Sequence, residues 1–218
     1  MSQNSLYQKS YSRRLTELGK LVPGTFKAFV EFDKLALSDG LIPKKTKELI
    51  AVAVAHVTGC PYCIDAHVTA SKRLEASKEE IAEAIMVATA LKAGSAMAHG
   101  LNALEAYDGE NSGDLYQKSS MARFKEFAEL SPEGFRSFNQ FDREAMKPGL
   151  ISRKDKELIA IAIAHVTGCP YCIEIHTKNL KKLGASHEEL AEAIFVATAL
   201  KAGSALAHSV NALNAYDY

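Results

Sequence analysis

The sequence lacks the features that mark a nucleic-acid-binding, membrane or secreted protein. Its 26 Lys and Arg residues balance its 26 Asp and Glu residues, so the formal net charge is zero. A neutral chain has no basic excess with which to bind nucleic acid or an anionic membrane surface. No uninterrupted apolar run reaches bilayer length, and the first residues, Met1–Ser5, contain no apolar signal-peptide core. We therefore expect a cytoplasmic protein whose partners are neither nucleic acid nor membrane.

Strand patterns and cysteines are also scarce. No segment shows a convincing alternation of apolar and polar residues, whereas the helix formers Ala, Leu, Lys and Glu abound. The chain has only four cysteines, and in a cytosolic protein such thiols more often serve catalysis or metal binding than structural cross-linking. With 47% apolar residues the chain can bury a sizeable core. These observations predict an all-α protein with functional cysteines.

The chain does contain an internal duplication. Each position in the first half matches the position 109 residues later without a gap, so that Ala88–Ser95 returns as Ala197–Ser204. Roughly 60 of about 109 aligned positions are identical, which identifies a tandem duplication and not a short solenoid repeat. We therefore predict two domains, residues 1–109 and 110–218, joined by a polar, glycine-containing linker at 109–114.

All four cysteines lie in two copies of one motif. The first copy is Cys-Pro-Tyr-Cys at Cys60–Cys63, with Glu48 twelve residues before it and His67 four residues after it. The second copy consists of Glu157, Cys169, Cys172 and His176. Two thiols, an imidazole and a carboxylate at a repeated spacing are the groups of a redox centre whose thiol is activated by a base.

The first motif is predicted to begin a helix. Gly59 suits the end of the preceding helix, and the proline after Cys60 suits the first turn of the next. Cys60 then lies near the N-cap, where free backbone amides and the helix dipole favour a thiolate. Cys63 and His67 are one turn apart on the same face, so the imidazole can take the thiol proton. Glu48, from the neighbouring helix, can orient His67.

From the residues alone, three interpretations of the motif stay open. Two thiolates, one imidazole and one carboxylate are four acceptable zinc ligands. Alternatively, the cysteines are buried structural thiols. The recurrence of the same intervening residues with the same histidine and glutamate, and the lack of a second Cys-x-x-Cys pair within each half, favour redox chemistry.

The coarse pattern predicts six helices in each half. In the first half they span residues 6–19, 24–37, 44–58, 61–75, 78–92 and 95–106, with copies 109 residues later. Ser77 and Ser186 each fit a capping box with a glutamate three residues on. Gly94 and Gly203 are expected to end one helix and let the next begin. The nearly all-apolar segment Leu49–Val57 predicts a buried central helix.

Several charged residues outside the motif have ordinary interpretations. His99 and His208 lie on small-residue helices, where close helix packing is the default and a pocket role is the alternative. The basic runs Lys44–Lys47 and Arg153–Lys156 are expected to form solvated faces.

The residues resemble those of the carboxymuconolactone decarboxylase superfamily, on its alkylhydroperoxidase D-like branch. The resemblance rests on the glutamate–cysteine–cysteine–histidine spacing in both halves and on the segments Lys47–Ala51 and Ala82–Ile85. It spans most of the chain. It implies an all-α fold of two tandem alkylhydroperoxidase D-like helical cores related by internal duplication.

The resemblance also implies a thiol-dependent peroxidase that needs no cofactor and no metal. Cys63, deprotonated through His67 and Glu48, would attack a small-molecule hydroperoxide and become a sulfenic acid. Cys60 would condense with it to a disulfide, and a dithiol electron donor would restore the thiols. Cys172, Cys169, His176 and Glu157 would play the same roles in the second half.

The resemblance leaves other functions open. Where well-studied branch members carry histidine between the cysteines, this chain has Tyr62 and Tyr171. A general disulfide reductase, a zinc-binding or structural module, and a non-redox enzyme acting on a lactone are the alternatives. Duplicated members of the superfamily form trimers, so the resemblance implies a homotrimer with six redox centres.

Overall fold

The computed structural model describes residues 6–109 and 113–217, and within these ranges it contains helices and connections but no strand. The structure is 83% helical, which confirms the all-α prediction with two repeated helical cores. Met1–Ser5 and residues 110–112 of the predicted linker lie outside the described residues. The domain boundary at 109/110 stays a prediction.

The helices follow the same order in both repeats. The first repeat contains the 3₁₀ helix η1 (Lys9–Arg14), then α1 (Leu15–Leu21), α2 (Pro23–Ala36), α3 (Lys44–Thr58), α4 (Pro61–Arg73) and α5 (Lys78–Asp108). The second repeat contains η2 (Lys118–Arg123), α6 (Phe124–Leu130), α7 (Pro132–Met146), α8 (Arg153–Thr167), α9 (Pro170–Lys182) and α10 (His187–Asp217).

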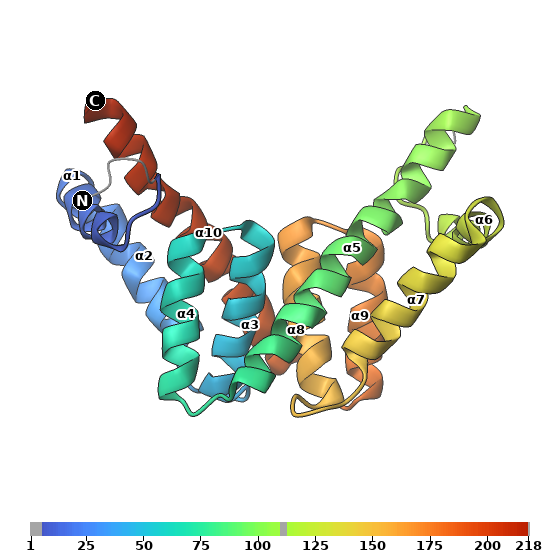
Figure 1. Ribbon diagram of the computed structural model, residues 1–218, viewed down its shortest axis with the longest axis horizontal. Coiled ribbons are helices and arrows are strands. Elements are labelled where there is room, and N and C mark those ends of the chain that lie inside the picture. Colours follow the sequence, from blue (N-terminus) through green and yellow to red (C-terminus); the bar gives the residue numbers. More distant parts are fainter. Residues whose placement is uncertain (1–5, 110–112, 218) are drawn as a thin grey trace.

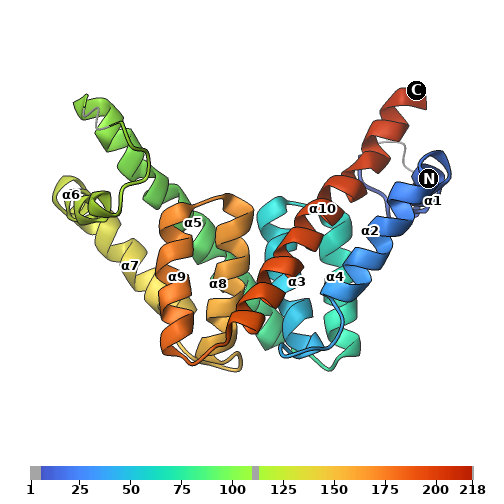
Figure 2. The ribbon, with the colours of Figure 1, turned by 180° about the vertical axis from the view of Figure 1, so that it is seen from behind.

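Four helices form the centre of the molecule, and two long helices cross them. Helices α3, α4, α8 and α9 stand side by side, with α5 across one face and α10 across the opposite face (Figures 1 and 2). The far ends of α5 and α10 diverge into two arms. One arm contains α5, α6 and α7, and the other contains α10, α1 and α2 together with both chain termini (Figure 1).

Each long helix therefore serves both repeats. Helix α5 packs on α3 of its own repeat and then on α8 and α7 of the other, while α10 packs on α8 and then on α3 and α2. Buried residues of α3, α5, α8 and α10 belong to one continuous hydrophobic cluster. As predicted, α3 is buried at its centre, from Lys47 to Ala55. The two repeats thus share a core.

The predicted helix breaks at Gly94 and Gly203 are wrong. Both glycines lie inside continuous 31-residue helices, α5 and α10. A glycine inside a helix costs about 1 kcal/mol relative to alanine. Packing against the other repeat offsets this cost: Gly94 faces the ring of Phe138 on α7, and Gly203 faces Phe29 on α2. The local sequence pattern does not reveal partners that are so distant in the chain.

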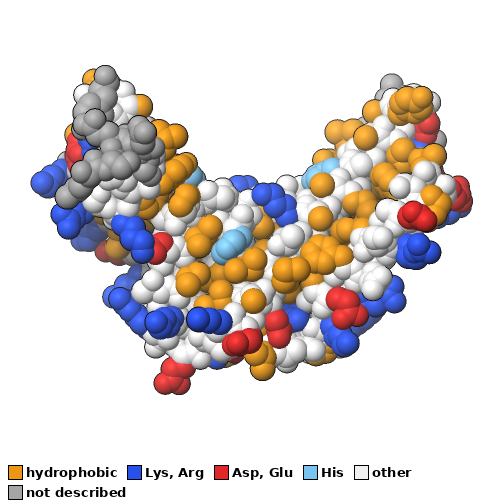
Figure 3. Space-filling model, in the orientation of Figure 1, with side chains coloured by type: hydrophobic (Ala, Val, Ile, Leu, Met, Phe, Trp, Pro, Cys, Tyr) orange, Lys and Arg blue, Asp and Glu red, His pale blue; other side chains and the backbone are white. Residues whose placement is uncertain are grey.

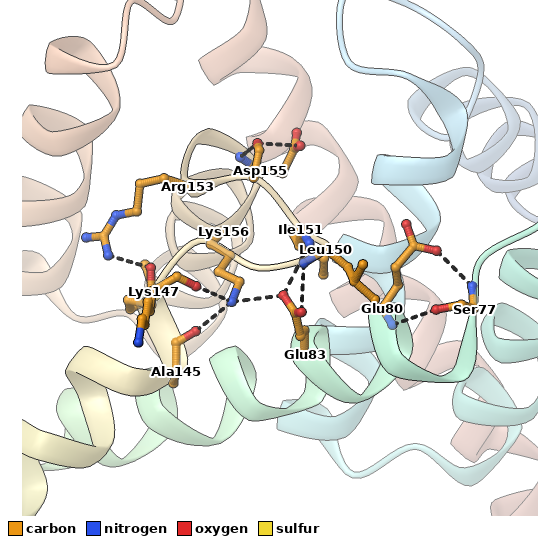
Figure 4. Close-up of polar contacts among 12 residues, drawn as sticks. Ser77, Glu80, Glu83, Ala145, Lys147, Leu150, Ile151, Arg153, Asp155 and Lys156 are labelled. Atoms are coloured by element: carbon orange, nitrogen blue, oxygen red, sulfur yellow. Dashed lines mark hydrogen bonds and ion pairs between the residues drawn. The ribbon is translucent and has the colours of Figure 1, made fainter.

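Reciprocal glutamate–lysine contacts fasten each long helix to the other repeat. Glu83 of α5 accepts hydrogen bonds from the backbone N–H groups of Leu150 (2.8 Å) and Ile151 (3.2 Å), and its carboxylate lies 3.0 Å from Nζ of Lys156 (Figure 4). The copy of this contact is formed by Glu192 with Leu41, Ile42 and Lys47. We call these two arrangements the Glu83 clamp and the Glu192 clamp.

The clamps correct the expectation that the basic runs are solvated throughout. Lys47 and Lys156 are buried, because each neutralises a clamp glutamate and donates hydrogen bonds to backbone carbonyls. Lys156 donates to the carbonyls of Ala145 (3.1 Å) and Lys147 (2.6 Å). Both predicted capping boxes are confirmed at the start of the long helices, where Ser77 and Ser186 each exchange two hydrogen bonds with a glutamate.

Helices α5 and α10 are long and apolar enough to cross a membrane by length and composition alone. The core helix of a water-soluble protein meets the same criterion, and both helices pack against the central helices here. Each helix also contains charged residues, such as Lys92 in α5 and Lys201 in α10, so neither is an uninterrupted apolar run. Cytoplasmic location stays a prediction.

Candidate functional site

Both cysteine motifs lie at a helix start, as predicted. Gly59 and Gly168 end α3 and α8 in the left-handed conformation, each with φ of 68°, which glycine adopts without steric cost. The chain then turns into α4 and α9. Cys60 occupies the N-cap of α4, where its Sγ accepts a hydrogen bond from the N–H of Cys63 at 3.2 Å. Cys169 and Cys172 repeat this contact at 3.2 Å.

In both motifs the two cysteines lie close together at the helix start. Cys60 and Cys63 form a disulfide with Cα atoms 5.3 Å apart, inside the usual range for such a bond. Cys169 and Cys172 are free thiols. The separation of the two cysteines at the helix start is therefore short enough for a disulfide within the motif.

A buried carboxylate contacts the motif histidine in each repeat. His67 Nδ1 lies 2.8 Å from Glu48 Oε2, and His176 Nδ1 lies 2.7 Å from Glu157 Oε2. Glu48 and Glu157 are buried on α3 and α8. Contact through Nδ1 orients the ring and leaves Nε2 available for proton exchange. The structure thus pairs each predicted histidine with its predicted glutamate.

Glu157, the glutamate of the second motif, accepts hydrogen bonds from two more side chains. Arg153 Nη2 lies 2.7 Å from Glu157 Oε1, and Asn179 Nδ2 donates to the same oxygen at 3.3 Å. The matching positions in the first repeat are Lys44 and Ala70. Ala70 has no polar side chain, so the first repeat cannot reproduce the amide contact.

The thiols of the second motif differ in acidity and in exposure. A hydrogen bond from Cys172 is the main cause that lowers the pKa of Cys169 to about 6, against opposing burial, with the Cys172 N–H and the Ser95 hydroxyl as further donors. That same contact with Cys169, with burial second, raises the pKa of Cys172. Cys169 is fully buried, whereas Cys172 is 6% exposed. The N-cap cysteine is thus the more acidic of the two, and the second cysteine is the less deeply buried residue.

Two aspartates near the histidine–glutamate pairs were missed in the sequence. Burial raises the pKa of Asp33 on α2, which lies within electrostatic reach of His67 and Glu48. Burial also raises the pKa of Asp142 on α7, the copy of Asp33. The available signal was the Phe-Asp pair that recurs at 32–33 and 141–142. It was missed because α2 and α7 looked like extensions outside the motif.

Each motif also contacts the long helix of the other repeat. Ala98 and Leu101 of α5 pack in one cluster with Cys169, Tyr171 and Cys172. In the first motif, Ala207 of α10 packs in the same way with Cys60 and Cys63. Each dithiol is therefore enclosed by residues from both halves of the chain.

Aromatic clusters lie beside these contacts. The Tyr116 ring lies 5.7 Å from that of Tyr171 and 5.8 Å from that of His99, centroid to centroid. In the first repeat the Tyr7 ring lies 5.9 Å from that of Tyr62 and 6.0 Å from that of His208. His99 and His208 thus lie near the motifs, which the sequence offered only as the alternative to close helix packing.

A cavity of about 650 Å³ adjoins the first motif. Its lining comes from the N-terminal segment, including Tyr7 and Ser12, and from α4, including Pro61 and Tyr62 between the two cysteines. A cavity of this size accepts a small organic molecule. No group of three or more His, Cys, Asp or Glu side chains within the described ranges is arranged to bind a metal ion.

Parts of the chain are similar to two bacterial proteins. A protein named uncharacterized protein 4 in cox locus, from Paracoccus denitrificans, is 51% identical over 81 residues, covering 37% of this chain and 73% of its own length. Uncharacterized protein H16_B0147 from Cupriavidus necator is 33% identical over 100 residues, covering 46% of this chain and 88% of its own length. Each match covers less than half of this chain.

A solved structure has the same fold across nearly the whole chain. It comes from Burkholderia xenovorans LB400 and is named as a candidate gamma-carboxymuconolactone decarboxylase subunit. It matches with a TM-score of 0.63 over 95% of this chain and 96% of its own, at 19% identity, which supports the fold alone. The sequence profile of the carboxymuconolactone decarboxylase family matches twice, at residues 23–106 and 132–215. The chain therefore belongs to the carboxymuconolactone decarboxylase family and contains two tandem copies of its domain.

Proposed function

We propose that the chain is a thiol-dependent peroxidase that reduces small hydroperoxides at two dithiol centres. The observation that carries the proposal is the motif itself: two cysteines at one helix start, with Cα atoms 5.3 Å apart in the first repeat, which is close enough for a disulfide. In each repeat a buried glutamate orients the histidine one turn beyond the second cysteine.

In the first step the second cysteine of the motif attacks, because it is the less deeply buried residue of the pair. Cys172 passes its proton to the thiolate of Cys169, to which it is hydrogen-bonded. The Cys172 sulfur then attacks the terminal oxygen of R–O–OH. The O–O bond breaks, an S–OH bond forms, and the released alkoxide takes a proton from His176 and leaves as an alcohol.

The second step closes the disulfide. Cys169 returns its proton to His176, and its thiolate attacks the sulfur of the Cys172 sulfenic acid. The S–O bond breaks, and the leaving hydroxide takes the proton back from His176 to become water. An external dithiol then attacks the Cys172 sulfur, Cys169 leaves as a thiolate, and the second donor thiol completes the transfer. Cys63, Cys60, His67 and Glu48 act in the same order in the first repeat.

The test is peroxide consumption with a panel of dithiol donors, including dihydrolipoamide, using the complete chain. The proposal predicts catalytic loss of hydrogen peroxide or an organic hydroperoxide that requires a dithiol. A protein that reduces small disulfides but leaves every peroxide intact is the general disulfide reductase instead. The decarboxylase name of the Burkholderia structure supports no lactone activity here, since 19% identity supports the fold alone.

We further propose that three chains assemble into a closed ring with six dithiol centres. Apolar side chains cover the middle of the face that carries α5 (Figure 3). Met86 of α5 and its copy Phe195 of α10 are 46% and 56% exposed. Cyclic symmetry would bury this surface without leaving an open end. Sedimentation equilibrium should report three times the chain mass of 23.7 kDa; a stable monomer would contradict the ring and leave the thiol chemistry untouched.

A further inference from the structure

We propose that Ser95 and His99 of α5 stabilise the Cys169 thiolate of the second repeat, and that Ser204 and His208 of α10 stabilise the Cys60 thiolate of the first. Each dithiol centre is then completed by the other repeat. The inference rests on the proposed dithiol function and adds to it the groups that prepare the N-cap cysteine as the leaving thiolate.

The contacts at the second centre carry the argument. Ser95 is buried, and its hydroxyl is one of the groups that lower the pKa of Cys169. His99 lies one turn further along α5, where a positive charge on its ring favours the Cys169 thiolate. Ala98, between them, packs in the cluster that contains Cys169 and Cys172. Helix α5 therefore faces the buried sulfur with a hydroxyl and an imidazole.

The first centre has the same arrangement. Ser204 of α10 is buried, and Ala207 packs in the cluster that contains Cys60 and Cys63. His208 contacts the ring of Tyr7, which contacts the ring of Tyr62 between the two cysteines. The hydroxyl and imidazole of α10 thus lie at the matching helical positions, although they belong to the second repeat.

This arrangement has a chemical use when the disulfide is reduced. An external thiolate attacks the sulfur of the less deeply buried cysteine, and the buried N-cap sulfur is expelled. A sulfur whose thiolate is stabilised leaves faster. The hydroxyl and the imidazole from the other repeat therefore assist the same step in which the electron donor is consumed.

Several titratable groups lie in or beside the second dithiol centre and bear on the charge of its sulfurs. They are Cys172 on α9, Asp142 on α7, the His176–Glu157 pair, His99 on α5, and the tyrosines Tyr116 and Tyr171. A test must therefore separate the contribution of α5 from that of the groups within the same repeat.

The experiment uses the full chain with one centre removed at a time. In a Cys60→Ser/Cys63→Ser background, ultraviolet absorbance of the thiolate is followed against pH. Ser95→Ala should raise the pKa of Cys169 by about one unit, as expected for losing a hydrogen bond to a charged group. His99→Gln should shift the pKa in the same direction. At pH 7 a rise from about 6 to about 7 moves the dithiol–disulfide equilibrium about fivefold toward the disulfide.

The repeat supplies matched controls. Ser204→Ala and His208→Gln make the same changes at the same helical positions but face the other centre, so they should leave the Cys169 titration unchanged. In a Cys169→Ser/Cys172→Ser background the pattern should reverse. The pKa of Cys60 should then rise in Ser204→Ala and His208→Gln and stay unchanged in Ser95→Ala and His99→Gln. Ser95→Thr, which keeps the hydroxyl, should retain the low pKa and guards against a folding effect of Ser95→Ala.

Two results would overturn the proposal. One is a Cys169 titration that ignores both Ser95→Ala and His99→Gln, and the other is an equal response to the Ser204 and Ser95 variants. Neither readout uses peroxide. A crossed pattern of pKa shifts in a protein that consumes no peroxide would refute the proposed peroxidase and leave this inference intact.

Discussion

In the second repeat Glu157 contacts His176, Arg153 and Asn179, whereas in the first repeat the described contact of Glu48 is with His67. The reactive groups are otherwise the same in both copies. The duplication thus kept the two thiols, the imidazole and the carboxylate and changed the residues that support the carboxylate. Changes at the residues that contact the glutamate therefore alter how the carboxylate is positioned, while the groups that react stay the same.

The contacts that hold the two repeats together, in contrast, are the same in both copies. The Glu83 clamp and the Glu192 clamp use the same residue types at matching positions, with ion-pair distances of 3.0 and 2.9 Å. Gly149 and Gly40 face the two clamp carboxylates so closely that a Cβ at either position would displace them. The shared core therefore constrains both copies alike, while the carboxylate sites can diverge.

The largest expected effect comes from removing the attacking sulfur in both repeats. Cys63→Ser with Cys172→Ser should lower peroxide turnover at least about a thousandfold, as expected for loss of a nucleophile. The matched variant is Cys60→Ser with Cys169→Ser, which keeps the attacking thiols. Without a donor it should show at most one turnover per centre, slower than in the parent because the attacking cysteine has lost the thiolate that accepts its proton. It should then stop, because no disulfide can form within the motif.

The single variants test whether the two centres are equal. Cys63→Ser and Cys172→Ser alone should each retain about half of the activity if the centres work independently. Unequal residual rates would show that the extra contacts of Glu157 matter for turnover. Full activity in the double variant would refute the assignment of these sulfurs.

The clamps should contribute equally to stability. Glu83→Gln and Glu192→Gln should each lower the free energy of unfolding by about 2 kcal/mol, because each leaves a buried lysine without its charged partner. Urea unfolding of the complete chain measures the change. Glu31→Gln, on an exposed helix face, should change it by less than about 0.5 kcal/mol. A large difference between the two clamp variants would show that the repeats are joined unequally.

The clamps also predict how stability depends on pH. Burial alone would raise the pKa of Glu83, but the N–H groups of Leu150 and Ile151 together with Lys156 lower it overall. The pKa of Glu192 is lowered in the same way. A group with a lowered pKa in the folded state stabilises the protein above its ordinary value of 4.5 and loses that contribution as the pH falls. The Glu83→Gln/Glu192→Gln double variant should therefore lose less free energy of unfolding than the parent protein between pH 5 and pH 3, measured by urea unfolding at each pH.

A smaller effect should follow from the additional donors to Glu157. With the first centre removed, Asn179→Ala should lower the rate of peroxide reduction about threefold to tenfold, because the carboxylate that orients His176 loses one of its contacts. Ala70→Asn, with the second centre removed, is the reciprocal change and should leave the rate equal or raise it. Stopped-flow reduction of peroxide by each single-centre protein measures both. Equal rates for Asn179→Ala and its parent would mean that this support is not used.

The sequence predicted the parts of the molecule that depend on local patterns. The helix start at the cysteines followed from the glycine, proline and cysteine order, and the central helix followed from its apolar residues. The contact between Glu48 and His67 was also expected, since both residues recur at fixed spacing. Local patterns are sufficient for these features because the determining residues lie within one or two neighbouring helices.

Features formed between the repeats could not be predicted in this way. Gly94 looked like a helix end because the partner that stabilises the continuing helix, Phe138, lies in the other repeat. Lys47 looked solvated because its carboxylate, Glu192, is far along the chain. His99 offered no sign that it reaches a cysteine motif in the opposite half. All three depend on helices crossing between repeats, which periodicity within one helix does not reveal.

The central claim is that each cysteine pair is a peroxide-oxidised dithiol. The most direct test is mass spectrometry of the fully reduced chain after a small excess of hydroperoxide, without any donor. The account predicts a loss of two hydrogens per motif, with peptides that link Cys60 to Cys63 and Cys169 to Cys172. Four unchanged thiols, or disulfides that link one motif to another, would contradict it.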